Sequence, residues 1–203
     1  MPRDRARERV SRERAEVPPR QALQQRVASA ILQAGARTFA SRGDRANLAD
    51  VAVAAGVARA TVYRYFPNRR RLLDELSRIT AEDVHARLML ARIDEVAVEE
   101  GLSRAVRTFV DAGDAFVVLV RERAGGDGEQ FERLVSAPVR NLLEAGRSAG
   151  AIRDDVAPAW LFESLVGLVA GALRHGSLGP DDTVACVTSV FLQGARAVRS
   201  RER

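Results

Sequence analysis

The sequence predicts an all-helical protein, and composition and periodicity are the two observations that carry this prediction. The 203 residues are 46% apolar but only 5% aromatic, and helix-favouring Ala, Leu, Arg and Glu are abundant. Runs of Val, Ile and Thr bounded by turns, which would indicate strands, are scarce, and apolar residues instead recur three and four positions apart. We expect about nine helices, arranged as a three-helix N-terminal domain followed by a larger helical body.

Residues 1–21 are expected to form a disordered arginine-rich arm. Arginine alternates there with acidic residues and serine, and too few apolar side chains are present to build a core. A simply solvated start and an arm that touches DNA backbone or minor groove both fit this composition.

Three helices are expected between residues 22 and 68. The first spans residues 23–41 and is followed by Gly43, which suits a helix end. Asn47 is a good N-cap for the second helix, which Gly56 ends. The third runs over residues 58–66 and stops before Pro67.

The rest of the chain, residues 69–203, is expected to form a helical effector-binding and dimerisation domain. Asn68 can cap a fourth helix that reaches Leu90. Glycine, proline and acidic signals then delimit five more helices, with a loop at residues 125–128. Their expected spans are 94–111, 113–124, 129–149, 157–175 and 181–200.

Charge separates the two parts of the chain. Residues 22–80 hold ten arginines against four acids, whereas residues 81–203 hold fifteen against nineteen, and no lysine occurs anywhere. A basic N-terminal domain on a mildly acidic body is the pattern expected of a nucleic-acid reader with an attached non-DNA domain. Every cationic contact would be made by the planar fork of a guanidinium group.

The spacing of small residues within residues 47–66 indicates a helix-turn-helix. Ala52 lies where two helices would cross, Gly56 allows the tight turn, and Val62 plugs the interface between the helices. On the outward side, Arg59 could fork onto guanine, and Ala60 is short enough to let the helix approach the groove floor. Thr61 could meet a thymine methyl or a phosphate, while Tyr63 and Tyr65 offer hydroxyls to phosphates, although either could be an ordinary surface aromatic.

Three consecutive arginines follow this unit at residues 69–71, in the first turn of the fourth helix. Cations at that end oppose the helix dipole, which makes the run locally unfavourable until an anion arrives. A DNA phosphate could use both the guanidinium groups and the free N–H groups of the turn. A merely solvated arginine run is the alternative.

The segment from Ile31 to Leu73 closely resembles the tetracycline-repressor (TetR-type) family of bacterial transcription regulators. The family's Phe-Ala-x-x-Gly step matches residues 39–43, and its Ala-Gly-Val-Ser-x-x-Thr-Leu-Tyr-x-x-Phe segment matches residues 55–66. Asn47 replaces the usual Thr or Ser, Ala58 replaces a frequent Ser at the start of the third helix, and Arg69 replaces the usual Lys.

The resemblance implies a homodimer that reads a near-palindromic operator in double-stranded DNA and releases it when a small molecule enters the body. It implies these DNA contacts: Asn47, Arg59, Ala60, Thr61, Tyr63, Arg64, Tyr65 and Arg69, with Arg45 as a plausible additional phosphate contact. The last two helices would then form a four-helix bundle between two chains. The expected interface is Leu161, Leu165, Leu168, Ala172, Val184, Val187, Phe191 and Ala195, for which ordinary intramolecular core is the alternative.

The effector pocket is the least specified part of the sequence. Phe109, Phe116, Phe131, Trp160 and Phe162 could line a cavity for an apolar or aromatic ligand, although each also suits a simple core position. His85 and His175 are isolated, and no spacing of Cys, His, Asp or Glu suggests a metal site, so neither metal nor cofactor is expected.

A cytoplasmic, non-enzymatic regulator is the leading interpretation. The single cysteine, Cys186, excludes an internal disulfide and fits a reducing compartment, and no apolar run is long enough to span a membrane. No nucleophile, base and orienting group converge in the pattern, which argues against an enzyme. Two alternatives remain: a DNA-binding regulator, including an activator, without a small-molecule effector, and a helical ligand-binding protein that has lost DNA binding.

Overall fold

The computed structural model describes residues 19–123 and 128–197 and has an all-helical architecture, as predicted. Most of the predicted arm and residues 125–127 of the predicted loop lie outside these ranges. The helices are α2 (Pro19–Arg42), α3 (Leu48–Ala55), α4 (Arg59–Tyr65), α5 (Arg69–Leu90), α6 (Val98–Glu122), α7 (Gly128–Phe131), α8 (Ala137–Ser148), α9 (Pro158–His175) and α10 (Pro180–Ala195), with a 3₁₀ turn η1 (Gly43–Arg45) and a π-helical turn η2 (Glu132–Ser136).

The boundaries of α3 follow the local signals in the sequence. The side-chain oxygen of Asn47 accepts hydrogen bonds from the N–H groups of Ala49 (2.8 Å) and Asp50 (3.1 Å), and Asp50 accepts from the N–H of Asn47 at 3.0 Å. This reciprocal arrangement is a capping box. Gly56 ends the helix at φ +66°, in the left-handed region that a residue without Cβ adopts at little cost.

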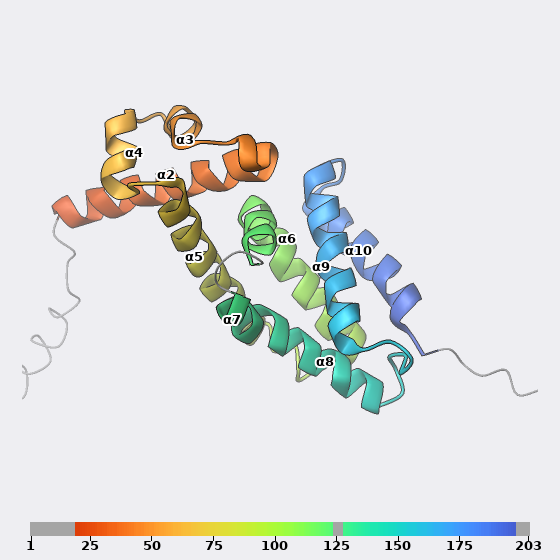
Figure 1. The fold of residues 1–203 in the computed structure, drawn as a ribbon. Helices are drawn as coiled ribbons and strands as arrows, with labels where there is room; N and C mark the ends of the chain where they lie inside the picture. The colour runs from red at the N-terminus through yellow and green to blue at the C-terminus, as the bar shows by residue number, and fades with distance from the viewer. Residues whose placement is uncertain (1–18, 124–127, 198–203) are drawn as a thin grey trace, which may run out of the picture.

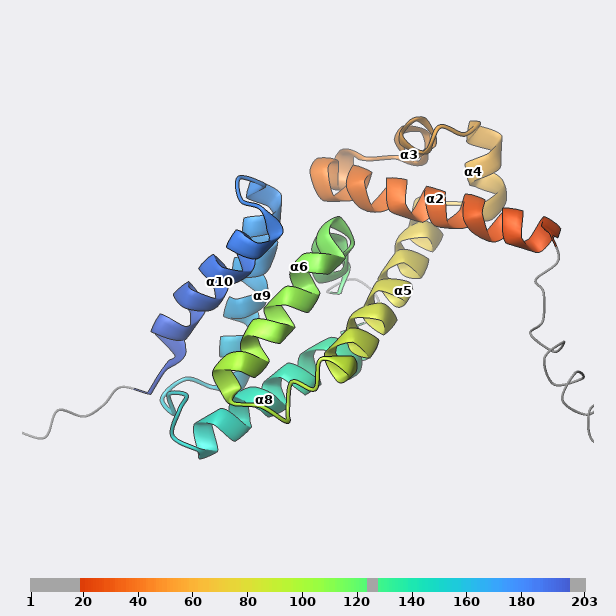
Figure 2. The same ribbon diagram turned by 180° about the vertical axis from the view of Figure 1, so that it is seen from behind.

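Helices α2, α3 and α4 form a small unit, called the head here, at one end of the molecule (Figure 1). Helix α5 leads from the head into the larger body formed by α6 to α10. Seen from either side, α9 and α10 lie at the end of the molecule away from α4 (Figures 1 and 2). The helix-turn-helix in the head therefore lies apart from the last two helices, α9 and α10.

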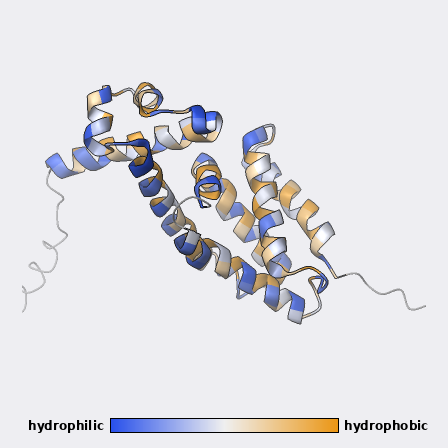
Figure 3. Ribbon diagram, viewed as in Figure 1, coloured by the Kyte–Doolittle hydropathy of each residue, from blue (hydrophilic) through white to orange (hydrophobic). Residues whose placement is uncertain are grey.

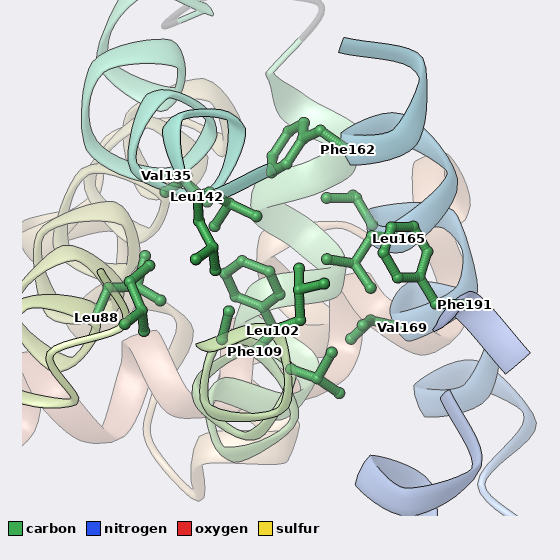
Figure 4. Packing of buried hydrophobic residues seen from close by; sticks show 14 of the residues in the cluster. Leu88, Leu102, Phe109, Val135, Leu142, Phe162, Leu165, Val169 and Phe191 are labelled. Carbon is green, nitrogen blue, oxygen red and sulfur yellow. The ribbon is translucent and has the colours of Figure 1, made fainter. Parts of the chain in front are cut away.

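Two clusters of buried apolar residues hold these parts together. The body core is built from α5 to α10, and side chains such as Leu102, Phe109 and Leu165 converge within it (Figure 4). The head core gathers Ile31 and Phe39 of α2, Val51 of α3 and Val62 of α4, all fully buried. The same core includes Leu72, Leu73 and Leu76 of α5, which follow the predicted domain boundary at residue 68 in the sequence. That boundary stays a prediction.

Helix α6 contributes to both cores, and Gly113 lies at the junction. Gly113 adopts φ +56° and ψ −131°, which kinks the helix at the position where the sequence predicts a break between residues 111 and 113. The rings of Phe109 and Phe116 stack across the kink with their centroids 4.5 Å apart. Beyond it, Val118 is fully buried in the head core, and Nη2 of Arg121 donates to the carbonyl of Phe39 at 2.8 Å.

Other helix boundaries differ modestly from prediction. Helix α2 begins at Pro19, inside the predicted arm, because proline is well tolerated in a first helical turn. The single helix predicted at 129–149 is an unbroken run of α7, η2 and α8. Helix α10 ends at Ala195 rather than near residue 200, and Arg196 leaves the helix to pair with Ile152 in an isolated antiparallel bridge.

Apolar positions are concentrated in α6, α9 and α10, which contribute to the body core, and polar positions lie along the upper part of α5 (Figure 3). Among the described residues, no helix is long and apolar enough to cross a membrane.

Candidate nucleic-acid interface

The predicted recognition helix, α4, divides its residues between the head core and solvent. Val62 is fully buried against the head, while Arg59, Ala60, Tyr63 and Arg64 are exposed. Thr61 and Tyr65 are half-buried and so combine packing with access to solvent. The outward face therefore carries the residue types expected of a groove-reading helix, on a scaffold that Val62 fixes.

Helix α4 begins without side-chain assistance. Ala58 occupies its N-cap position and makes no capping hydrogen bond, as the loss of the family's hydroxyl predicts. At the next helix, by contrast, the side-chain oxygen of Asn68 accepts from the N–H of Arg71 at 2.9 Å. One of the N–H groups expected to be free for phosphate is therefore already bonded.

The arginines of this surface fall into two electrostatic groups. Arg42 pairs with Asp50 at 2.8 Å, Arg69 with Asp44 at 3.3 Å, and Arg70 with Asp74 at 2.7 Å. Four others form no ion pair with any residue that the structure describes: Arg45, Arg59, Arg64 and Arg71. The second group keeps its full charge available for an incoming polyanion.

Arg69 is held more firmly than its neighbours. Its guanidinium carbon lies 5.1 Å from the centre of the Phe39 ring, and the side chain is only 34% exposed. Its Nε is buried without a hydrogen-bond partner among the described atoms. Asp44, whose side chain is 92% exposed, is its ion-pair partner and would have to share it with a phosphate.

Replacing Asn47 with alanine should lower the free energy of unfolding by about 1 kcal/mol, because two N–H groups of the first turn of α3 would have no acceptor. Chemical denaturation at one fixed protein concentration measures this difference. Asn141→Ala, at an exposed position within α8, is the matched control and should leave stability unchanged or slightly raised. Equal stability of Asn47→Ala and the unchanged protein would contradict the capping role.

The aromatic residues predicted to line an effector cavity do not share one environment. Phe109, Phe116, Phe131 and Phe162 are buried in the body core, and the rings of Phe131 and Phe162 are tilted with centroids 6.1 Å apart. Trp160 is 71% exposed, which contradicts its expected place beside them. It lies one position before Leu161 on α9, and a step of about 100° along the helix turns it away from the core.

The predicted dimer stripe is a further correction. Leu161, Leu165, Val184, Val187, Phe191 and Ala195 are all buried within one chain, and Leu168 and Ala172 pack against the same core. The alternative of intramolecular core therefore holds for them. The opposite side of the two helices, called the outer face here, carries Trp160, Ser164, Gly167, Cys186 and Val190, all exposed.

The two histidines remain isolated in the structure. Nδ1 of His85 lies 2.9 Å from the carbonyl oxygen of Leu134, which belongs to the π-helical turn η2, and His175 is exposed near the end of α9. No cluster of metal-binding side chains occurs in the described ranges.

Helix α5 carries a network of ion pairs on its exposed side. Hydrogen bonds from Arg78 lower the pKa of Glu75, and Arg78 also forms an ion pair with Glu82.

Comparison with known proteins bears on the head and on the whole fold. Residues 31–76 match the family model described as bacterial regulatory proteins, tetR family. The HTH-type transcriptional repressor KstR2 of Rhodococcus jostii is 27% identical over 174 residues, covering 80% of this chain and 85% of that protein. The HTH-type transcriptional repressor LfrR of Mycolicibacterium smegmatis is 29% identical over 136 residues, covering 67% and 71%.

The fold is shared with a solved structure of LfrR. The crystal structure of the TetR-like transcriptional regulator LfrR from Mycobacterium smegmatis, in complex with proflavine, superposes with a TM-score of 0.68 at 23% identity. The match covers 87% of this chain and 99% of LfrR. These likenesses show that residues 31–76 match the TetR-type family of bacterial regulatory proteins, and that the chain as a whole shares the fold of LfrR.

Proposed function

We propose that this protein is a cytoplasmic transcriptional repressor that binds an operator in double-stranded DNA as a homodimer and is released by a small apolar or aromatic effector. The observation that carries the proposal is the outward face of α4, where Arg59 and Arg64 stand exposed and free of ion pairs among the described residues. Both features suit a helix that reads the major groove.

Dimerisation is proposed through the outer face of α9 and α10, in place of the stripe that the core occupies. Trp160 and Val190 expose 71% and 51% of their surface there. A Cβ added at Gly167 would meet nothing within 4 Å, so a second helix could approach the chain closely at this point. Exposed aromatic and small residues on two adjacent helices are suited to a four-helix interface between two copies.

An effector is proposed because the related regulator LfrR was solved in complex with proflavine, a small aromatic molecule. In this chain, α6 offers a route from such a ligand to the DNA-binding surface, since the helix has residues in both cores. A ligand that moves the segment after Gly113 would displace Val118 and Arg121, and with them the end of α2. The ligand must favour one arrangement of the heads over the other for this to weaken DNA binding.

A gel shift against the DNA upstream of the protein's own gene tests the proposal. The dimer should retard a specific fragment at moderate salt, and unlabelled random DNA should not compete at equal concentration. Absence of any specific shift, both on this fragment and on a randomised-sequence selection, would overturn the proposed operator binding.

Replacing Arg69 with alanine should weaken binding to all DNA sequences alike, because a phosphate contact carries no sequence information. The plot of log affinity against log salt concentration should flatten by about one unit, the change expected when one phosphate is no longer neutralised. Arg133→Ala, an exposed arginine of η2 without an ion pair among the described residues, removes the same charge far from α4 and is the control. A sequence-selective weakening would show instead that Arg69 reads a base.

A further inference from the structure

A groove lies between the head and the body, away from the aromatic core positions that the sequence singles out. It has a volume of about 520 Å³ and is walled by α2, α5 and α6. A second hollow of about the same size adjoins it and shares Ser29, Leu32 and Ile79 with it. This volume is in the range of pockets that hold drug-sized molecules.

The groove has an apolar floor. Leu32 and Ala36 of α2 and Leu76 and Ile79 of α5 contribute to it, with Ala112 and Ala115 of α6 completing the third side. Ile79 remains 38% exposed, although its spacing along α5 matches the buried side of that helix. An apolar guest would cover this residue and recover part of the free energy that its exposure costs.

Carboxylates dominate the charge at the α6 wall. Asp111 and Asp114 flank Gly113, line the groove and form no ion pair with any described residue. Asp83 also lines it but is neutralised by Arg87 at 2.9 Å. Arg37, likewise without an ion pair in the described ranges, stands on the opposite, α2 rim, so two negative charges and one positive charge face the same space.

We propose that this groove binds a small apolar molecule carrying a positive charge, with its apolar part on the apolar floor and its cationic group against Asp111 and Asp114. The excess of carboxylates over guanidinium groups favours a cation over a neutral or anionic molecule of equal shape. Such a guest would touch α2, α5 and both sides of the Gly113 kink at once. The assignment of the groove as the effector site rests on the proposed function, whereas the binding of such a molecule in the groove does not.

Titration of the full-length protein with ethidium, followed by fluorescence anisotropy in the absence of DNA, tests the site. The double variant Asp111→Asn/Asp114→Asn should weaken ethidium binding about tenfold, since both carboxylate charges that would face the cation are removed. Asp94→Asn/Asp154→Asn changes the net charge equally at two exposed loop carboxylates without ion pairs among the described residues, and should leave the affinity unchanged. Phenanthridine, a neutral molecule with the same ring system, should bind the unchanged protein more weakly than ethidium does.

A second variant tests the groove while leaving Asp111 and Asp114 unchanged. Ile79→Arg places a cationic side chain at a partly exposed position in the groove and should abolish saturable ethidium binding while circular dichroism shows unchanged helix content. The absence of saturable binding to the unchanged protein, or equal binding by all four proteins, would overturn the site. A gel shift on the same proteins without ethidium separates the two proposals, because a protein that binds ethidium without binding DNA contradicts only the proposed function.

Discussion

Replacing Arg59 with alanine should lower affinity for the operator by about 1–3 kcal/mol for each base pair that the side chain reads, a weakening of roughly 5- to 150-fold. Arg59 is the first residue of α4, is exposed, and has no ion-pair partner in the described part of the chain, so little reorganisation is needed before it meets a guanine. Competition gel shifts with the operator and with each single-base-pair substitution measure the effect. At the position that Arg59 reads, the variant should no longer distinguish the four base pairs.

The matched control for this experiment is again Arg133→Ala, which removes one exposed arginine outside the head. It should retain both the affinity and the base preference of the unchanged protein. If Arg59→Ala weakened binding to random DNA by the same factor as binding to the operator, the side chain would be a phosphate contact and another residue would carry the specificity.

The head could be predicted closely from sequence because its boundaries depend on a few neighbouring residues. Asn47 and Asn68 cap the helices that follow them, and Gly56 takes the left-handed conformation that its position between two helices requires. Each of these outcomes is decided within four residues along the chain. The outward face of α4 follows from the same local geometry once Val62 is known to point inward.

The body could be predicted less well because periodicity shows that a helix has an apolar side without showing what covers it. The stripe through Leu161, Leu165 and Val187 is covered by the chain's own core, whereas Trp160, one residue away from Leu161, is exposed. Only the positions of α6 and α8 in space decide between these outcomes. The groove beside Gly113 could not be predicted for the same reason, since α2, α5 and α6 meet there from distant parts of the sequence.

Replacing Phe39 with alanine should destabilise the protein by about 3–5 kcal/mol, the largest single effect expected here, because it opens a cavity where a fully buried ring packs. The effect should also reach the DNA-binding surface, since Arg69 lies over this ring and depends on it for its placement. Urea denaturation at fixed protein concentration measures the stability, and the salt dependence of DNA binding measures the placement of Arg69.

Phe39→Leu separates the two roles of this residue. Leucine restores most of the buried volume but has no aromatic face for the guanidinium, so stability should largely recover while the placement of Arg69 does not. The carbonyl of Phe39, which accepts from Arg121, is retained in both variants, and the link from α6 to the head should therefore persist. If Phe39→Leu instead kept the salt dependence of DNA binding of the unchanged protein, the placement of Arg69 would not depend on the aromatic face of Phe39.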